Sequence, residues 1–81
     1  MSRAVHRLST KTVEKAREPG YYCDGAGLYL QVSPTASKSW IFRYTRHGES
    51  HEMGLGSERD VSLAEARTKA SDARRQLVGG H

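Results

Sequence analysis

The sequence predicts an α+β fold: a three-stranded antiparallel sheet with a carboxy-terminal helix packed on one face, after a short amino-terminal helix. Residues 28–32, 40–45 and 50–55 alternate apolar and polar side chains, which is the period of a half-buried strand. Residues 63–77 carry apolar side chains every three or four positions, which is the period of a helix that covers a core. With 81 residues, the chain has room for one domain with one modest core.

Residues 9–17 predict the short amino-terminal helix. Ser9 or Thr10 suits the N-cap, because a hydroxyl accepts hydrogen bonds from the free N–H groups of the first helical turn. Pro19 and Gly20 end the helix. We expect residues 1–8 to form a flexible basic arm, residues 9–78 a single domain, and residues 79–81 a linker or residues added by cloning.

A turn around Gly48 joins the second and third predicted strands. We take Asp24 to Gly27 as the turn before the first strand, and Arg46 to Glu49 as the hairpin loop. That loop fixes a register that brings apolar side chains together on one face, with the pairs Thr45–Ser50, Phe42–Met53 and Trp40–Leu55. The carboxy-terminal helix is expected to cover this apolar face.

Ser62 and Glu65 mark the start of the carboxy-terminal helix, because S-x-x-E is the pattern of a capping box. Its apolar stripe consists of Leu63, Ala66, Ala70, Ala73 and Leu77. Its basic side chains lie off that stripe and are interpreted as a solvated helix face: Arg67, Lys69, Arg74 and Arg75.

Composition favours a cytoplasmic protein that binds a polyanion. The formal net charge is +4, and the positive excess lies in the first twenty and last twenty-one residues. Cys23 is the single cysteine, so no intrachain disulfide can form. No apolar run is long enough to cross a membrane.

The motifs of catalysis and of cofactor binding are missing from the sequence. Gly25 and Gly27 lack the third glycine of a dinucleotide loop and precede a strand rather than a helix. Histidines and Cys23 lack the short spacings of a metal site, and no serine or cysteine has a recognisable base beside it. We therefore expect no enzyme activity, cofactor, metal or small-molecule substrate for this chain.

Four segments, taken in order, resemble the amino-terminal domain of prophage-type tyrosine integrases. They are Asp24 to Val32, Lys38 to Tyr44, Leu55-Gly56, and Val61 to Arg67. The charged stretch from Ser57 to Asp60 departs from the tyrosine- and proline-containing turn of that family. The resemblance implies a non-catalytic domain that binds arm-type DNA in support of DNA integration and recombination. It also implies contacts with other integrase protomers, and a separate downstream domain that performs strand cleavage.

The strand residues that point away from the helix are the candidate DNA-binding surface. A narrow antiparallel sheet fits the major groove, where Tyr29, Gln31, Arg43 and Thr45 would face base edges. Lys38 and Arg46 would contact phosphates at the two ends of the second predicted strand. Arg3, Arg7 and Lys11 would gather phosphates from the amino-terminal arm.

Other interpretations of this surface remain open. Arg43 lies across from Glu52 in the predicted register, so the two form an exposed cross-strand pair that needs no DNA. The same sheet and helix also suit a protein–protein interaction module that assembles a recombination complex without reading DNA. Binding of single strands ranks third, because it needs several open-face aromatic residues and only Tyr29 qualifies.

Overall fold

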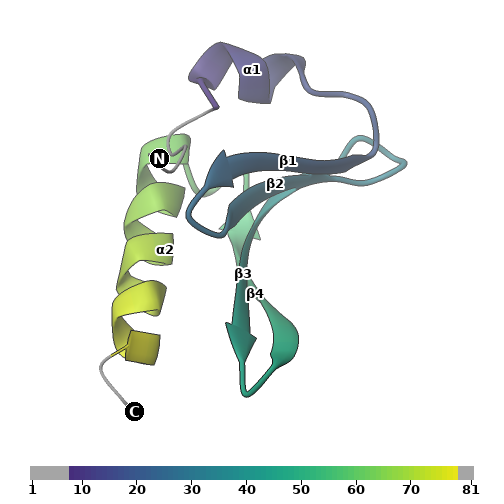
Figure 1. Cartoon of the computed structure of the whole chain (residues 1–81). Helices are drawn as coiled ribbons and strands as arrows, with labels where there is room; N and C mark the ends of the chain where they lie inside the picture. The colour runs from purple at the N-terminus through teal and green to yellow at the C-terminus, as the bar shows by residue number, and fades with distance from the viewer. Residues whose placement is uncertain (1–7, 79–81) are drawn as a thin grey trace, which may run out of the picture.

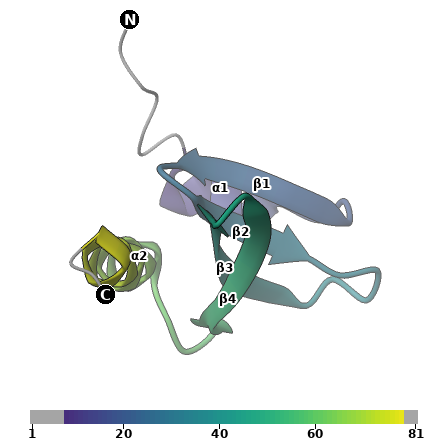
Figure 2. The same ribbon diagram turned by 60° about the horizontal axis from the view of Figure 1, so that its bottom comes forward.

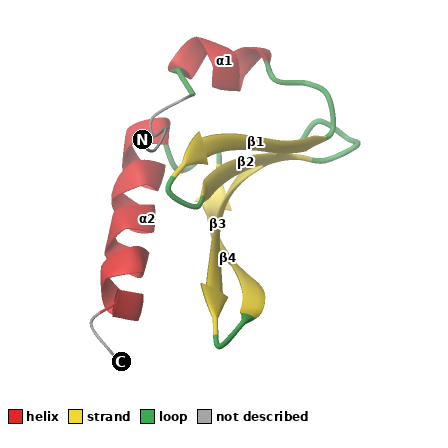
Figure 3. Ribbon diagram, viewed as in Figure 1, coloured by secondary structure: helices red, strands yellow, loops and turns green. Residues whose placement is uncertain are grey.

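The structure is a computed structural model that describes residues 8–78, and it contains one four-stranded antiparallel sheet and two helices (Figure 1). The elements are α1 (Thr10–Lys15), β1 (Gly20–Gly25), β2 (Leu28–Val32), β3 (Lys38–Arg46), β4 (Glu49–Ser57) and α2 (Leu63–Val78). The strands follow one another in chain order across the sheet, as Figure 3 shows. The α+β class, the short first helix and the carboxy-terminal helix are confirmed. The prediction of three strands is wrong, because β1 adds a fourth.

Strand β1 escaped prediction because a charged residue occupies one of its core positions. Asp24 is only 1% exposed and lies in the strand, not in the turn that the sequence suggests. It is the extra residue of a bulge, since Cys23 pairs with Tyr29 and Gly25 pairs with Leu28. The turn itself is only the two residues between Gly25 and Leu28. Their positive φ angles, 54° and 91°, fit the twist of a tight hairpin.

A second bulge, between β3 and β4, makes part of the register differ from the predicted one. Thr45 pairs with Ser50 and Phe42 with Met53, as predicted, but Trp40 pairs with Gly56 rather than Leu55. Gly56 has a φ of +125°, and a Cβ there would lie 2.7 Å from Cγ2 of Val61. The glycine is therefore needed where the chain leaves the sheet for α2.

Helix α2 begins with the predicted capping box and packs its small residues on the sheet. The Ser62 N–H donates to Oε1 of Glu65 at 2.9 Å, and the Glu65 N–H donates to Oγ of Ser62 at 3.1 Å. Viewed nearly along its axis, α2 stands on one side of the curved sheet (Figure 2). Its buried stripe consists of Ala66, Ala70 and Ala73. Small side chains there let the helix approach a face built from large ones.

The core lies between the helices and one face of the sheet. Its largest member, Trp40, is fully buried and donates from Nε1 to the carbonyl oxygen of Val61 at 2.7 Å. The other apolar strand residues of the core are Leu28, Leu30, Val32 and Phe42. Leu8 is also buried there, so it belongs to the packed domain and not to the predicted arm. The rest of the predicted arm, residues 1–7, and the predicted linker, residues 79–81, lie outside the described residues.

Candidate nucleic-acid interface

One face of the sheet is left without a helix in the described part of the chain, since α1 and α2 both pack on the other. Strict alternation along β2 and β3 produces this face: Leu28, Leu30 and Val32 are buried, whereas the residues between them are half-buried. We call it the open face. Its side chains come from all four strands and are Tyr21, Cys23, Tyr29, Gln31, Ser39, Ile41, Arg43, Thr45, Ser50 and Glu52.

Arg43 occupies the middle of the open face and is held by three neighbours. Its guanidinium carbon lies 5.8 Å from the ring centre of Tyr21 and 5.5 Å from that of Tyr29. Its Nε lies 3.3 Å from Oε2 of Glu52, directly across the β3–β4 ladder. Both side chains of this ion pair remain 41% exposed. The guanidinium is thus oriented by aromatic and ionic contacts and still reachable from solvent.

Tyr21 is a member of the surface that sequence reasoning missed, because it arrives on the unpredicted strand β1. It is 48% exposed, and its ring meets that of Tyr29 edge-on with centres 6.2 Å apart. Gln31 lies opposite Tyr21 in the ladder, and its Nε2 is 3.5 Å from the tyrosine hydroxyl. The two consecutive tyrosines before Cys23 were the available signal, since aromatic residues favour strands. The open face therefore presents two aromatic rings rather than one.

Thr45 and Arg46 lie at the exposed end of the β3–β4 hairpin. Thr45 pairs with Ser50 and Arg46 with Glu49, and all four residues are exposed. The hairpin loop is the two-residue turn His47-Gly48, in which φ is 54° and 79°. A tight turn of this kind holds the strand ends in register. Because successive strand residues point to opposite faces, Thr45 lies on the open face and Arg46 on the other side of the hairpin.

Lys38 is turned toward α1 rather than toward the open face. Its Nζ donates to the carbonyl oxygens of Val13 at 2.7 Å and Glu14 at 3.0 Å. Lys38 therefore donates hydrogen bonds to carbonyl groups in the last turn of α1, which have no partner within the helix. This explains how so short a helix is held on the sheet. The structure does not bring Lys38 together with the other predicted DNA-binding residues.

The helix face that was expected to be solvated contains instead an ion pair between Arg67, which is 27% exposed, and a buried carboxylate. Arg67 donates from Nε and Nη2 to the two carboxylate oxygens of Asp24, at 3.0 and 2.9 Å, and from Nη2 to the Leu8 carbonyl oxygen. The Leu8 N–H in turn donates to Asp24. The hydrogen bond to Asp24 raises the pKa of Arg67. This cluster joins α2, β1 and the start of the domain.

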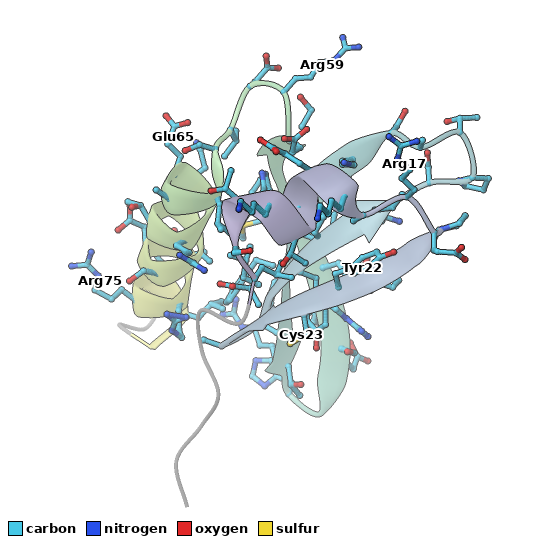
Figure 4. The ribbon with its side chains drawn as sticks, turned by 90° about the horizontal axis from the view of Figure 1, so that it is seen from above. Arg17, Tyr22, Cys23, Arg59, Glu65 and Arg75 are labelled. Atoms are coloured by element: carbon cyan, nitrogen blue, oxygen red, sulfur yellow. The ribbon has the colours of Figure 1, made fainter. Side chains whose placement is uncertain are left out.

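The other basic residues of α2 differ from one another in their surroundings. Arg74 donates to the carbonyl oxygen of Ala26 at 3.1 Å and is half-buried. Arg75 forms an exposed pair with Asp72 three residues before it, and its side chain extends away from the ribbon (Figure 4). The interpretation as a solvated face therefore holds for Arg75 and the exposed Lys69, but is wrong for Arg67 and for the half-buried Arg74.

Two negative findings apply to residues 8–78. No three histidine, cysteine, aspartate or glutamate side chains gather there in a way that could hold a metal ion. No helix in that range is long and apolar enough to cross a membrane. The predicted arm residues Arg3 and Arg7 lie outside the described range.

Comparison with known proteins finds the same likeness along nearly the whole chain. A family model described as the arm DNA-binding domain matches residues 8–81. The chain is 38% identical to an integrase of Enterobacteria phage P4, over 91% of this chain and 18% of that protein. It is 36% identical to the integrase of Shigella phage Sf6 and to the prophage integrase IntS of Escherichia coli (strain K12), in each case over 90% of this chain and 20% of the relative. The chain thus spans about a fifth of the length of these curated relatives.

Proposed function

Because the chain belongs to the arm DNA-binding domain family, we propose that it recognises arm-type duplex DNA by placing the open face of its sheet in the major groove. The chain itself performs no catalysis in this proposal, and it serves the DNA integration and recombination of a longer integrase. In that protein it would act beside other protomers and a separate catalytic domain. The observation that carries the proposal is Arg43, oriented between two tyrosines on a face that neither helix covers.

Base recognition is assigned to side chains at the centre of the open face. Arg43 has the planar fork that matches O6 and N7 of guanine, and Gln31 has the amide that matches N6 and N7 of adenine. Tyr21 and Tyr29 restrict the guanidinium before DNA arrives, so less side-chain entropy is lost on binding. Thr45 lies nearer the hairpin end, where its methyl and hydroxyl groups suit a thymine methyl or a phosphate.

Phosphate contacts are assigned to the ends of this surface. Arg46 at the hairpin edge is exposed and would follow the backbone beside the groove. Arg3 and Arg7, from the segment before Leu8, would add contacts with a phosphate backbone or a minor groove. Lys38 is left out of this set, because its ammonium group is occupied by carbonyl oxygens of α1.

Titration with duplex DNA at two salt concentrations tests the proposal. A duplex is first selected by the chain from a randomised pool, and an isotope-labelled sample then reports which amides shift on binding it. We expect steep salt dependence and shifts concentrated on β2, β3 and β4. Arg3→Ala should weaken binding to selected and scrambled duplexes alike and should flatten the salt slope by about one unit. Salt-independent binding, or shifts confined to α2, would contradict the proposal and favour a protein-docking module.

A further inference from the structure

Glu52 is an acidic side chain on a surface that is proposed to meet a polyanion. It lies on the edge strand β4, 3.3 Å from Arg43, and is 41% exposed, so it belongs to the open face. The ladder places it directly opposite Arg43. A carboxylate at this position opposes any phosphate that approaches Arg43, and this cost falls on complexes in which Arg43 contacts a phosphate.

We infer that Glu52 is a specificity-determining residue, which restrains Arg43 from binding phosphates and releases it only to a base that offers two acceptors. This inference rests on the proposed function. Specificity is the difference between the binding free energies for the preferred DNA and for unrelated DNA. A group that weakens binding to unrelated DNA therefore raises specificity as effectively as one that strengthens binding to the preferred DNA. When Arg43 leaves Glu52 for guanine, two hydrogen bonds to the base replace the lost ion pair. When Arg43 instead contacts a phosphate, the negative charge of the phosphate is brought close to the carboxylate of Glu52.

The geometry around Arg43 supports this role over a merely solubilising one. Tyr21 and Tyr29 hold the guanidinium by contacts that do not depend on Glu52. Removing the carboxylate therefore leaves Arg43 in place on the open face but free to accept phosphates. The expected consequence is stronger binding to unrelated DNA, with little gain for the preferred site.

The chain offers a closely matched control on the opposite side of the molecule. Asp72 on α2 also pairs with an exposed arginine, Arg75, at 2.8 Å. Glu52→Gln and Asp72→Asn each remove one negative charge and each leave an arginine without its carboxylate. Only the first change lies on the open face.

The experiment compares affinities for the duplex selected by the parent chain and for a scrambled duplex of equal composition, at two salt concentrations. We expect Glu52→Gln to lower the ratio of the two affinities by about three- to tenfold, mainly through tighter binding of the scrambled duplex. Asp72→Asn should raise both affinities slightly and keep the ratio. In an Arg43→Ala background, Glu52→Gln should no longer change the ratio, because the restrained group is absent.

Equal ratios for Glu52→Gln and Asp72→Asn would overturn the role of Glu52 and leave the proposed function standing. A ratio that falls in the Arg43→Ala background as well would also overturn it. If the parent chain selects no preferred duplex, the proposed function fails and the inference fails with it. Far-ultraviolet circular dichroism of each variant confirms that the fold is retained, and Glu52→Ala provides a second removal of the charge with the same expected loss.

Discussion

Two arginine–carboxylate pairs lie on opposite faces of the same sheet and have opposite surroundings. On the helix-covered face, Arg67 binds both oxygens of Asp24, a carboxylate that is 1% exposed. On the open face, Arg43 reaches Glu52 through one nitrogen at 3.3 Å, and both side chains are 41% exposed. The residue types are alike, but in the first pair the carboxylate is buried and Arg67 is 27% exposed, whereas both members of the second pair remain accessible to solvent.

The difference shows that burial, and not charge, decides what a basic residue of this domain can do. A buried carboxylate without its partner costs several kilocalories per mole, so Arg67 is committed to Asp24 and Leu8. An exposed pair contributes little in water, so Arg43 can leave Glu52 at small cost. The 13 lysine and arginine residues of the chain therefore overstate the number of cationic side chains that are free to meet DNA.

Breaking the buried pair should produce the largest effect. Arg67→Ala is expected to lower the free energy of unfolding by about 3–5 kcal/mol, because the buried carboxylate of Asp24 loses the two charged hydrogen bonds that Arg67 donates. Urea unfolding followed by circular dichroism measures this loss. Arg75→Ala, which removes an exposed arginine from the same helix, should change the free energy by less than about 0.5 kcal/mol. A loss below about 1 kcal/mol for Arg67→Ala would contradict the structural role of the pair.

The buried pair also shows where sequence reasoning reaches its limit. Local periodicity identified β2, β3, β4 and α2, because their patterns depend only on neighbouring residues. It missed β1, because Asp24 breaks the apolar pattern and its partner Arg67 lies 43 residues away. No local rule connects two such distant charges. The second bulge, where Leu55 is the extra residue because Ile41 pairs with Gly54 and Trp40 with Gly56, was missed because it depends on how closely Val61 approaches Gly56.

The open face was predictable in part, because the alternation of β2 and β3 assigns side chains to faces without any knowledge of the whole fold. That reasoning placed Tyr29, Gln31, Arg43 and Thr45 together, as the ladder does. Tyr21 was missed together with its strand. Alternation also places Lys38 on the covered face with Trp40 and Phe42, so its absence from the open face was predictable. Its carbonyl partners on α1 lie 24 and 25 residues away along the chain, and alternation carries no information about them.

Removing the exposed arginine should affect DNA recognition more than folding. Arg43→Ala is expected to weaken binding to the selected duplex by about 1–3 kcal/mol, and binding to a scrambled duplex by less. Its effect on the free energy of unfolding should stay below about 1 kcal/mol. Fluorescence anisotropy with both duplexes measures the binding, with Arg75→Ala as the matched control. Equal losses of binding free energy for the two duplexes would show that Arg43 contacts phosphates and does not recognise a base.

Lys38 and Arg46, at the two ends of β3, allow a second comparison between a basic residue that is bound within the fold (a committed cation) and one that is free to contact DNA (an available cation). Lys38→Met should lower the free energy of unfolding by about 1–2 kcal/mol, because two carbonyl oxygens of α1 lose a charged donor. It should leave the salt slope of DNA binding unchanged. Arg46→Met should do the reverse, with little loss of stability and a slope reduced by about 0.9. A reduced slope for Lys38→Met would return that residue to the DNA-binding set.

The smallest effect is expected from the exposed pair itself when no DNA is present. A double-mutant cycle with Arg43→Ala and Glu52→Ala should give a coupling of about 0.2–1 kcal/mol in the free energy of unfolding. Urea unfolding at low and high salt measures it, and salt should decrease it because the pair is exposed. A coupling that small is what allows Arg43 to exchange a carboxylate for a base at little cost. A coupling above about 2 kcal/mol would place Arg43 with Arg67 among the committed cations, and the contrast between the two faces would no longer hold.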